Sequence, residues 1–103
     1  MLARWPDTEV VICVSDLSAF GALMECQRRG LRVPQDLSVT GFDGVTVDGL
    51  GRHILTTSVQ PATQKGRAAG EQVTRMLRGE STASQHLTCR FRAGTTTATP
   101  PAR

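Results

Sequence analysis

Two short apolar runs on either side of a helical pattern constrain the fold of this chain more than any other feature. The run EVVICV at residues 9–14 is nearly continuous in apolar side chains, which predicts a strand covered on both faces in a parallel sheet. A helical pattern fills residues 16–29, a turn with Pro34 follows, and LSVTGF at residues 37–42 predicts a second strand. This order predicts an α/β fold that begins with a right-handed βαβ unit.

The helix predicted at residues 16–29 carries two sets of apolar side chains. We expect Leu17, Phe20 and Met24 to form its inner stripe, because they recur at helical spacing. Flanking this stripe are the side chains of Ala19, Leu23 and Cys26. They indicate either a second covered face or one broad core face, and both interpretations are open at this point.

The second half of the chain predicts one more strand, a second helix and a final strand. LTTSV at residues 55–59 forms the third strand, after a glycine-rich loop at residues 44–54. Pro61 begins a helix that Gly79 ends, and HLTCRFRA at residues 86–93 forms the final strand. The inner face of that helix is expected to consist of Ala62, Gly66, Ala69, Val73, Met76 and Leu77.

Charge and cysteine usage exclude several classes of function. The chain of 103 residues has a formal net charge of only +3, which is too small to indicate a nucleic acid partner. Residues 1–59 carry five basic and seven acidic side chains, whereas residues 60–103 carry seven basic and two acidic ones. Cys13, Cys26 and Cys89 lack the spacing of a metal site, and the sequence has neither a signal peptide nor a membrane span. We therefore expect a small cytoplasmic protein with reduced thiols, no metal, no cofactor and no membrane contact.

Polar side chains follow each of the first three predicted strands. Ser15 and Asp16 come after the first strand, Asp43 after the second and Gln60 after the third. Ligands of open α/β sheets bind at the carboxyl ends of strands, and a carboxylate beside an amide suits a polyhydroxylated ligand. Each residue also has a structural interpretation: Ser15 and Asp16 as helix caps, Asp43 in a turn with Gly44, and Gln60 as a surface amide.

No catalytic pattern emerges from the sequence. His53 and His86 have no acid–base partner at a familiar spacing. The glycines of residues 41–51 fit neither a dinucleotide fingerprint nor a P-loop, and the single lysine of the chain, Lys65, does not complete one. The sequence therefore predicts a binding protein and not an enzyme, with no catalytic residue.

Four motifs in a fixed order resemble the effector-binding domain of LacI/GalR-type transcription regulators. They are VICVSDLSAFGAL at residues 11–23, RRGLRVPQDLSVTGFDG at 28–44, LTTSVQP at 55–61 and KGRAAGEQVTRMLRGE at 65–80. The resemblance implies a partial periplasmic-binding-protein-like fold of the α/β class. Such a fold has a short parallel sheet with flanking helices, made of the βαβ unit, a third strand, a crossover helix and a final strand.

The resemblance also implies roles for individual residues. Asp43 stands where the family's aspartate contacts a sugar or purine, and Gln60 stands where a residue joins two subdomains and reaches the ligand. Ser15 occupies the place of the family's usual asparagine, so it is the third ligand-binding candidate. The family's dimer contact corresponds to residues 17–27 and 45–54. It implies four interface residues on the first helix, Leu17, Phe20, Leu23 and Met24.

Within the family this chain corresponds to part of a larger protein. Residues 1–60 match the C-terminal subdomain, residues 61–86 the crossover helix of the other subdomain, residues 87–97 a returning strand, and residues 98–103 a flexible tail. The family's DNA-binding helix-turn-helix lies outside this chain. The resemblance therefore implies the sensing and dimerisation part of a repressor that responds to a sugar or nucleobase-like effector, forms a homodimer, and contacts DNA only through that other domain.

Two alternatives stay open. The chain is also compatible with a fragment of a periplasmic sugar-binding protein, which shares the two-lobed fold. The second alternative is an independent small flavodoxin-like α/β domain, which would be compact without a partner.

Overall fold

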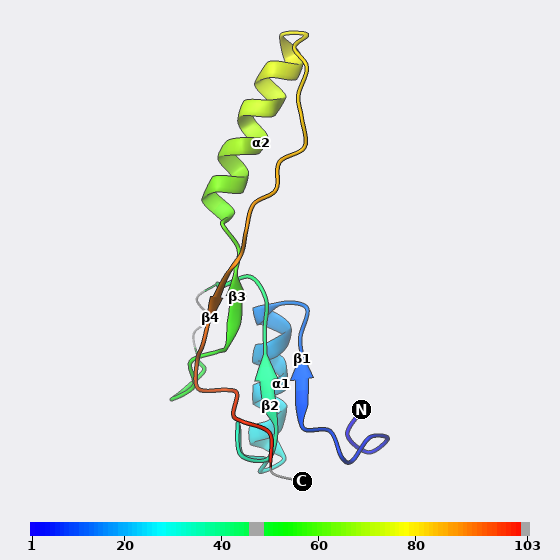
Figure 1. Ribbon diagram of the computed structural model, residues 1–103. Coiled ribbons are helices and arrows are strands. Elements are labelled where there is room, and N and C mark those ends of the chain that lie inside the picture. The colour runs from blue at the N-terminus through cyan, green and yellow to red at the C-terminus, as the bar shows by residue number, and fades with distance from the viewer. Residues whose placement is uncertain (46–48, 102–103) are drawn as a thin grey trace.

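The computed structural model describes residues 1–45 and 49–101 (Figure 1). The elements in these residues are β1 (Val10–Ile12), α1 (Asp16–Arg28), β2 (Ser38–Thr40), β3 (Thr57–Val59), α2 (Ala62–Leu77) and β4 (Arg90–Arg92). Their order matches the prediction from the sequence, although each strand is shorter than expected. The predicted loop at residues 44–54 and the predicted tail at residues 98–103 lie partly outside the described residues.

The strands form two pairs that are joined through backbone bridges. β1 and β2 are parallel, which confirms the βαβ unit. β3 and β4 are antiparallel. Parallel bridges join Thr40 to Thr56 and Asp43 to Val59, so the chain that leaves β2 runs beside β3. The amides of Gly41 and Asp43 donate to the carbonyls of Thr56 and Ser58 over 2.9 and 3.0 Å. The carboxyl ends of β2 and β3 therefore meet at one edge.

The core lies between α1 and this sheet. Its buried apolar side chains are Ala19, Leu23, Val39 and Leu55, with Cys26 also buried. The predicted inner stripe of α1 is wrong, because Leu17 is 71% exposed and Met24 is 55% exposed, whereas Leu23 is 6% exposed. Leu23 thus points into the core of its own chain, which contradicts its predicted place at a dimer interface.

Asp16 explains why α1 turns this face inward. The Asp16 side chain is fully buried, and Ala19, Leu23 and Cys26 follow it at intervals of three, four and three residues, which places them on the same side of a helix. Because three hydrogen bonds to the loop after β2 and to the buried Thr57 fix the carboxylate of Asp16, the rotation of α1 about its axis is fixed with it. The apolar pattern alone allowed either face to be the inner one.

β1 is covered on one face only. Ile12 is 78% exposed and Val14 is 86% exposed, while Val11 and Cys13, on the opposite face, are half-buried. The prediction that this strand is covered on both faces is therefore wrong for the part of the chain that the structure describes. The physical reason is that α1 covers one face of the β1–β2 pair, while α2 stands away from the other.

α2 projects away from the rest of the molecule (Figure 1). Its bounds agree with the predicted helix to within a residue at each end, and the molecule measures 57 × 30 × 24 Å along its principal axes. None of the described residues of α2 is buried, and Leu77 is 84% exposed. The apolar stripe predicted for this helix therefore lies open, although residues 80–89 run back beside α2 in the same view.

Candidate ligand-binding site

Asp43 and Gln60, two of the predicted ligand-binding residues, are in direct contact. Gln60 Nε2 donates to Asp43 Oδ1 over 2.6 Å, and the Gln60 amide N–H donates to the Asp43 carbonyl over 2.9 Å. Asp43 follows β2 and Gln60 follows β3, so the parallel bridge between these segments brings the two side chains together. This pair is the centre of the candidate site.

Asp43 has an unusual backbone conformation. Its φ angle is 126°, a region that residues other than glycine rarely adopt because the side chain crowds the backbone. Hydrogen bonds on both sides hold it there, since its N–H donates to the Ser58 carbonyl and its own carbonyl accepts from Gln60. Such strain is common where a side chain must be aimed at a ligand.

Lys65 extends this pair into a chain of three side chains. Its ammonium group donates to Gln60 Oε1 over 2.7 Å, while the amide nitrogen of Gln60 donates to Asp43. The Gln60 amide is thus oriented by a cation on one side and a carboxylate on the other. Lys65 is not among the site residues that the sequence predicted. The available signal was its position as the only lysine, five residues after Gln60.

Asp16 is a structural support for the site and not one of its open groups. Its Oδ2 accepts from the N–H groups of Gly44 and Val45, each over 2.8 Å, and its Oδ1 accepts from Thr57 Oγ1 over 2.6 Å. These bonds tie the segment after Asp43 to the beginning of α1. The predicted capping role of Asp16 is wrong, because its carboxylate bonds to the loop after β2 and to β3 and not to the first turn of α1.

Close approach of the chain requires glycine at residue 41. A Cβ atom there would collide with the Asp16 carboxylate and, at 2.9 Å, with Leu55 Cδ2. The absence of a side chain therefore lets the segment that leaves β2 pass directly over the buried carboxylate. Gly41 therefore helps to position Asp43, which follows it by two residues.

Ser15 caps α1. Its φ and ψ angles of −151° and 161° are extended, and its Oγ accepts from the Ser18 N–H over 3.1 Å. The same oxygen lies 3.0 Å from Ser18 Oγ, to which it donates. The capping interpretation is confirmed, and contact between Ser15 and a ligand stays a prediction.

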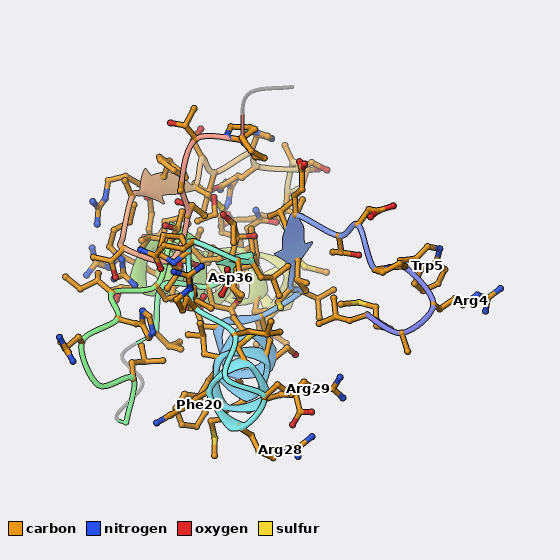
Figure 2. The ribbon with its side chains drawn as sticks, turned by 90° about the horizontal axis from the view of Figure 1, so that it is seen from below. Arg4, Trp5, Phe20, Arg28, Arg29 and Asp36 are labelled. Atoms are coloured by element: carbon orange, nitrogen blue, oxygen red, sulfur yellow. The ribbon has the colours of Figure 1, made fainter. Side chains whose placement is uncertain are left out.

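Two cavities in the described residues bear on the site. One, of about 840 Å³, lies beside the C-terminal half of α1 and is lined by residues that include Phe20, Met24 and His53. Figure 2 shows Phe20 projecting sideways from α1. A groove of about 470 Å³ is lined by Gln60 and Lys65 together with residues 85–87 and Cys89, and Asp43 is outside this lining. Polar side chains line both cavities, but the smaller one contains two of the three hydrogen-bonded side chains, Gln60 and Lys65.

Metal-binding clusters, membrane-spanning helices and reactive cysteines are the other functional features to consider in the described residues. No cluster of His, Cys, Asp or Glu there is arranged to hold a metal ion, and no helix there is long and apolar enough to cross a bilayer. Cys13, Cys26 and Cys89 are free thiols. Burial raises the pKa of Cys13 and of Cys26, which favours the protonated thiol over the thiolate at both positions.

Comparison with protein families assigns the fold. The model of the periplasmic binding protein-like domain matches residues 2–97, so the chain belongs to this family. Its relatives and structural neighbours are regulators of the LacI family, as the four motifs predicted. The partial periplasmic-binding-protein-like fold is thereby confirmed.

Two curated relatives illustrate the similarity. The HTH-type transcriptional regulator IpsA of Corynebacterium glutamicum is 39% identical over 99 residues, which cover 95% of this chain and 27% of that protein. The HTH-type transcriptional regulator GntR of Escherichia coli K12 is 33% identical over 88 residues, which cover 85% of this chain and 27% of that protein. The chain therefore spans about a quarter of the length of these relatives.

Solved structures agree with the sequence relatives. A LacI-family transcriptional regulator from Corynebacterium glutamicum is 41% identical, with a TM-score of 0.78 over 94% of this chain and 28% of the solved one. A LacI-family regulator from Arthrobacter sp. FB24, solved in complex with lactose, is 31% identical, with a TM-score of 0.77 over 94% of this chain and 37% of that chain.

Proposed function

We propose that residues 1–103 form the ligand-sensing part of a transcription regulator that responds to a small polyhydroxylated molecule, a sugar or a nucleoside-like compound. The observation that carries the proposal is the 2.6 Å hydrogen bond between Gln60 and Asp43 at the carboxyl ends of β2 and β3. It supplies a carboxylate acceptor beside an amide that is both donor and acceptor, which matches the hydroxyl groups of such a ligand. The lactose complex of a structural neighbour supports a sugar as the ligand class.

Binding would be linked to the position of α2. Gln60 is followed by Pro61, after which α2 begins. Asp43 belongs to the part of the molecule formed by α1 and the strands, which we call the α/β body. The hydrogen bond between Gln60 and Asp43 therefore crosses the junction between this body and α2. A ligand that bonds to both side chains favours one arrangement of this junction over others. Hydrogen bonds to a charged acceptor contribute about 1.5–3 kcal/mol each, enough to shift such an equilibrium by tenfold or more.

The same proposal includes a partner and a location. The exposed side chains of Leu17 and Met24, together with Phe20, form an outer face on α1 that suits contact with a second copy of the chain. DNA would be bound by another part of the parent protein. The site would bind a ligand without catalysing a reaction. A regulator of this kind would work in the cytoplasm.

Calorimetric titration of the protein with lactose, cellobiose and adenosine tests the ligand assignment. Asp43→Asn keeps the size of the side chain and removes its charge, so we expect the affinity for the ligand that binds to fall by about tenfold or more. Asp7→Asn removes an exposed charge far from the site and should leave the affinity unchanged. Equal affinity of the wild-type and Asp43→Asn proteins would show that Asp43 does not contact the ligand.

A further inference from the structure

We propose that Lys65 determines the specificity of this site, and that the ligand is a polyhydroxylated molecule with an anionic group, either a carboxylate or a phosphate. This inference rests on the proposed function of Asp43 and Gln60. It goes beyond that function because it assigns a charge to the ligand and an orientation in the site. The evidence is the chain of hydrogen bonds from Lys65 through Gln60 to Asp43.

The three side chains form a polarised array. Lys65 is the cationic end, Asp43 is the anionic end, and the amide of Gln60 lies between them with its oxygen toward the lysine. An ammonium group has three N–H donors and Gln60 accepts one of them, which leaves two for a ligand. The array therefore offers N–H donors of Lys65 at one end and carboxylate acceptors of Asp43 at the other, with the side-chain amide of Gln60 between them.

Among the described residues that line the groove beside Lys65, none is an aspartate or a glutamate. The other polar side chains of this lining are the neutral amides of Gln60, Gln72 and Gln85 and the imidazole of His86. The described ion pairs are formed by other residues, and Lys65 is bonded to a neutral amide instead of a carboxylate. The positive charge is thus available to a ligand in the groove.

The two charges fix how a ligand would lie. Asp43 repels an anionic group and accepts hydrogen bonds from hydroxyls, so the hydroxyls belong at its end of the array. The carboxylate or phosphate belongs at the lysine end, where a charge-assisted hydrogen bond forms. A neutral sugar satisfies Asp43 but leaves the ammonium group without an anionic partner. The anionic ligand should therefore bind about tenfold more tightly than its neutral counterpart.

Titrations followed by NMR of the 103-residue chain test this inference. The probes are D-glucose and D-galactose, each compared with its uronate and its 6-phosphate at one ionic strength, and the side-chain amide signal of Gln60 reports occupancy of the site. Comparison of the affinities for the uronate and for the 6-phosphate shows whether the site prefers a carboxylate or a phosphate. We expect at least one anionic sugar to bind about tenfold more tightly than the neutral sugar, and added salt to reduce the difference.

Three variants localise the effect. Lys65→Met keeps most of the apolar stem and removes the charge, so it should abolish the preference for the anionic sugar over the neutral one. Lys65→Arg keeps the charge and should retain the preference. Arg67→Met is the matched control, because residue 67 lies about 200° around α2 from residue 65 and carries the same charge. It should leave the preference intact.

The outcomes separate this inference from the function on which it rests. If neutral and anionic sugars bind equally, or if Lys65→Met leaves the preference unchanged, the inference fails while the proposed function stands. If Arg67→Met abolishes the preference as Lys65→Met does, the effect belongs to the net charge of α2, and Lys65 is not the determinant. If no probe shifts the Gln60 signal, both the inference and the proposed sugar site are overturned.

Discussion

At the scale of single residues, the buried carboxylate of Asp16 holds the strand end that carries Asp43. Three donors converge on it, the N–H groups of Gly44 and Val45 and the hydroxyl of Thr57. A buried charge is stable only when its hydrogen bonds are satisfied, and here the donors come from two separate points of the chain, residues 44–45 and Thr57. Asp16 therefore links the beginning of α1, the loop after β2 and the strand β3.

Removal of this carboxylate should destabilise the fold. Asp16→Ala leaves the three donors without their acceptor, and we expect the free energy of unfolding to fall by about 3 kcal/mol or more. Denaturant titration followed by circular dichroism measures the change. Asp7→Ala, which removes an exposed carboxylate, should alter stability by less than about 0.5 kcal/mol. A small effect of Asp16→Ala would mean that the loop is held by other contacts.

At the scale of elements, α1 shows where an apolar pattern fails to define the core. Leu17, Phe20 and Met24 have helical spacing, and so do Ala19, Leu23 and Cys26, so the sequence allowed either set to face inward. Burial of Asp16 selects the second set. A polar residue at the start of the helix thus decides which apolar residues form the core, and hydrophobic periodicity contains no such information.

Paired substitutions on α1 distinguish its two faces. Leu23→Ala opens a cavity in the core and should lower the free energy of unfolding by about 2–5 kcal/mol, whereas Leu17→Ala should change it by less than about 0.5 kcal/mol. In the proposed dimeric parent protein, Met24→Glu should shift the equilibrium toward monomers without unfolding them. Sedimentation velocity measures the second effect. A dimer unchanged by Met24→Glu would place the contact on another surface.

The strands and the site were predictable to different degrees. Apolar runs bounded by turn residues defined β1, β2 and β3, and the strand-end rule brought Asp43 and Gln60 to one place, because parallel strands end at the same edge. The sequence marked Lys65 only as the single lysine near Gln60, and the contact between the two side chains was not predictable from it. This contact depends on the direction in which a long side chain on α2 folds back, which is set by the angle between α2 and β3 and not by local sequence.

At the scale of the whole molecule, α2 lacks the packing that stabilises most helices. It has no buried residue, and its sequence contains glycines at positions 66 and 70, where the structure has open space around an added Cβ atom. Isolated helices of this length are marginal in water, because packing of an apolar face supplies most of their stability. The α1 helix does pack an apolar face against the sheet, so it should be more stable than α2.

Hydrogen exchange of the 103-residue chain should reveal this difference. We expect the amides of α2 (Ala62–Leu77) to exchange about tenfold faster or more than those of α1 (Asp16–Arg28), because α2 opens without disrupting the core. Gly66→Ala and Gly70→Ala should each slow exchange within α2 and leave α1 unchanged, since alanine is favoured over glycine by about 0.8–1.0 kcal/mol in a helix. Gly41→Ala, which collides with Asp16 and Leu55, should instead speed exchange in α1. If α2 is as well protected as α1 before any substitution, its open stripe must be covered in solution, and a second copy of the chain becomes the first candidate to cover it.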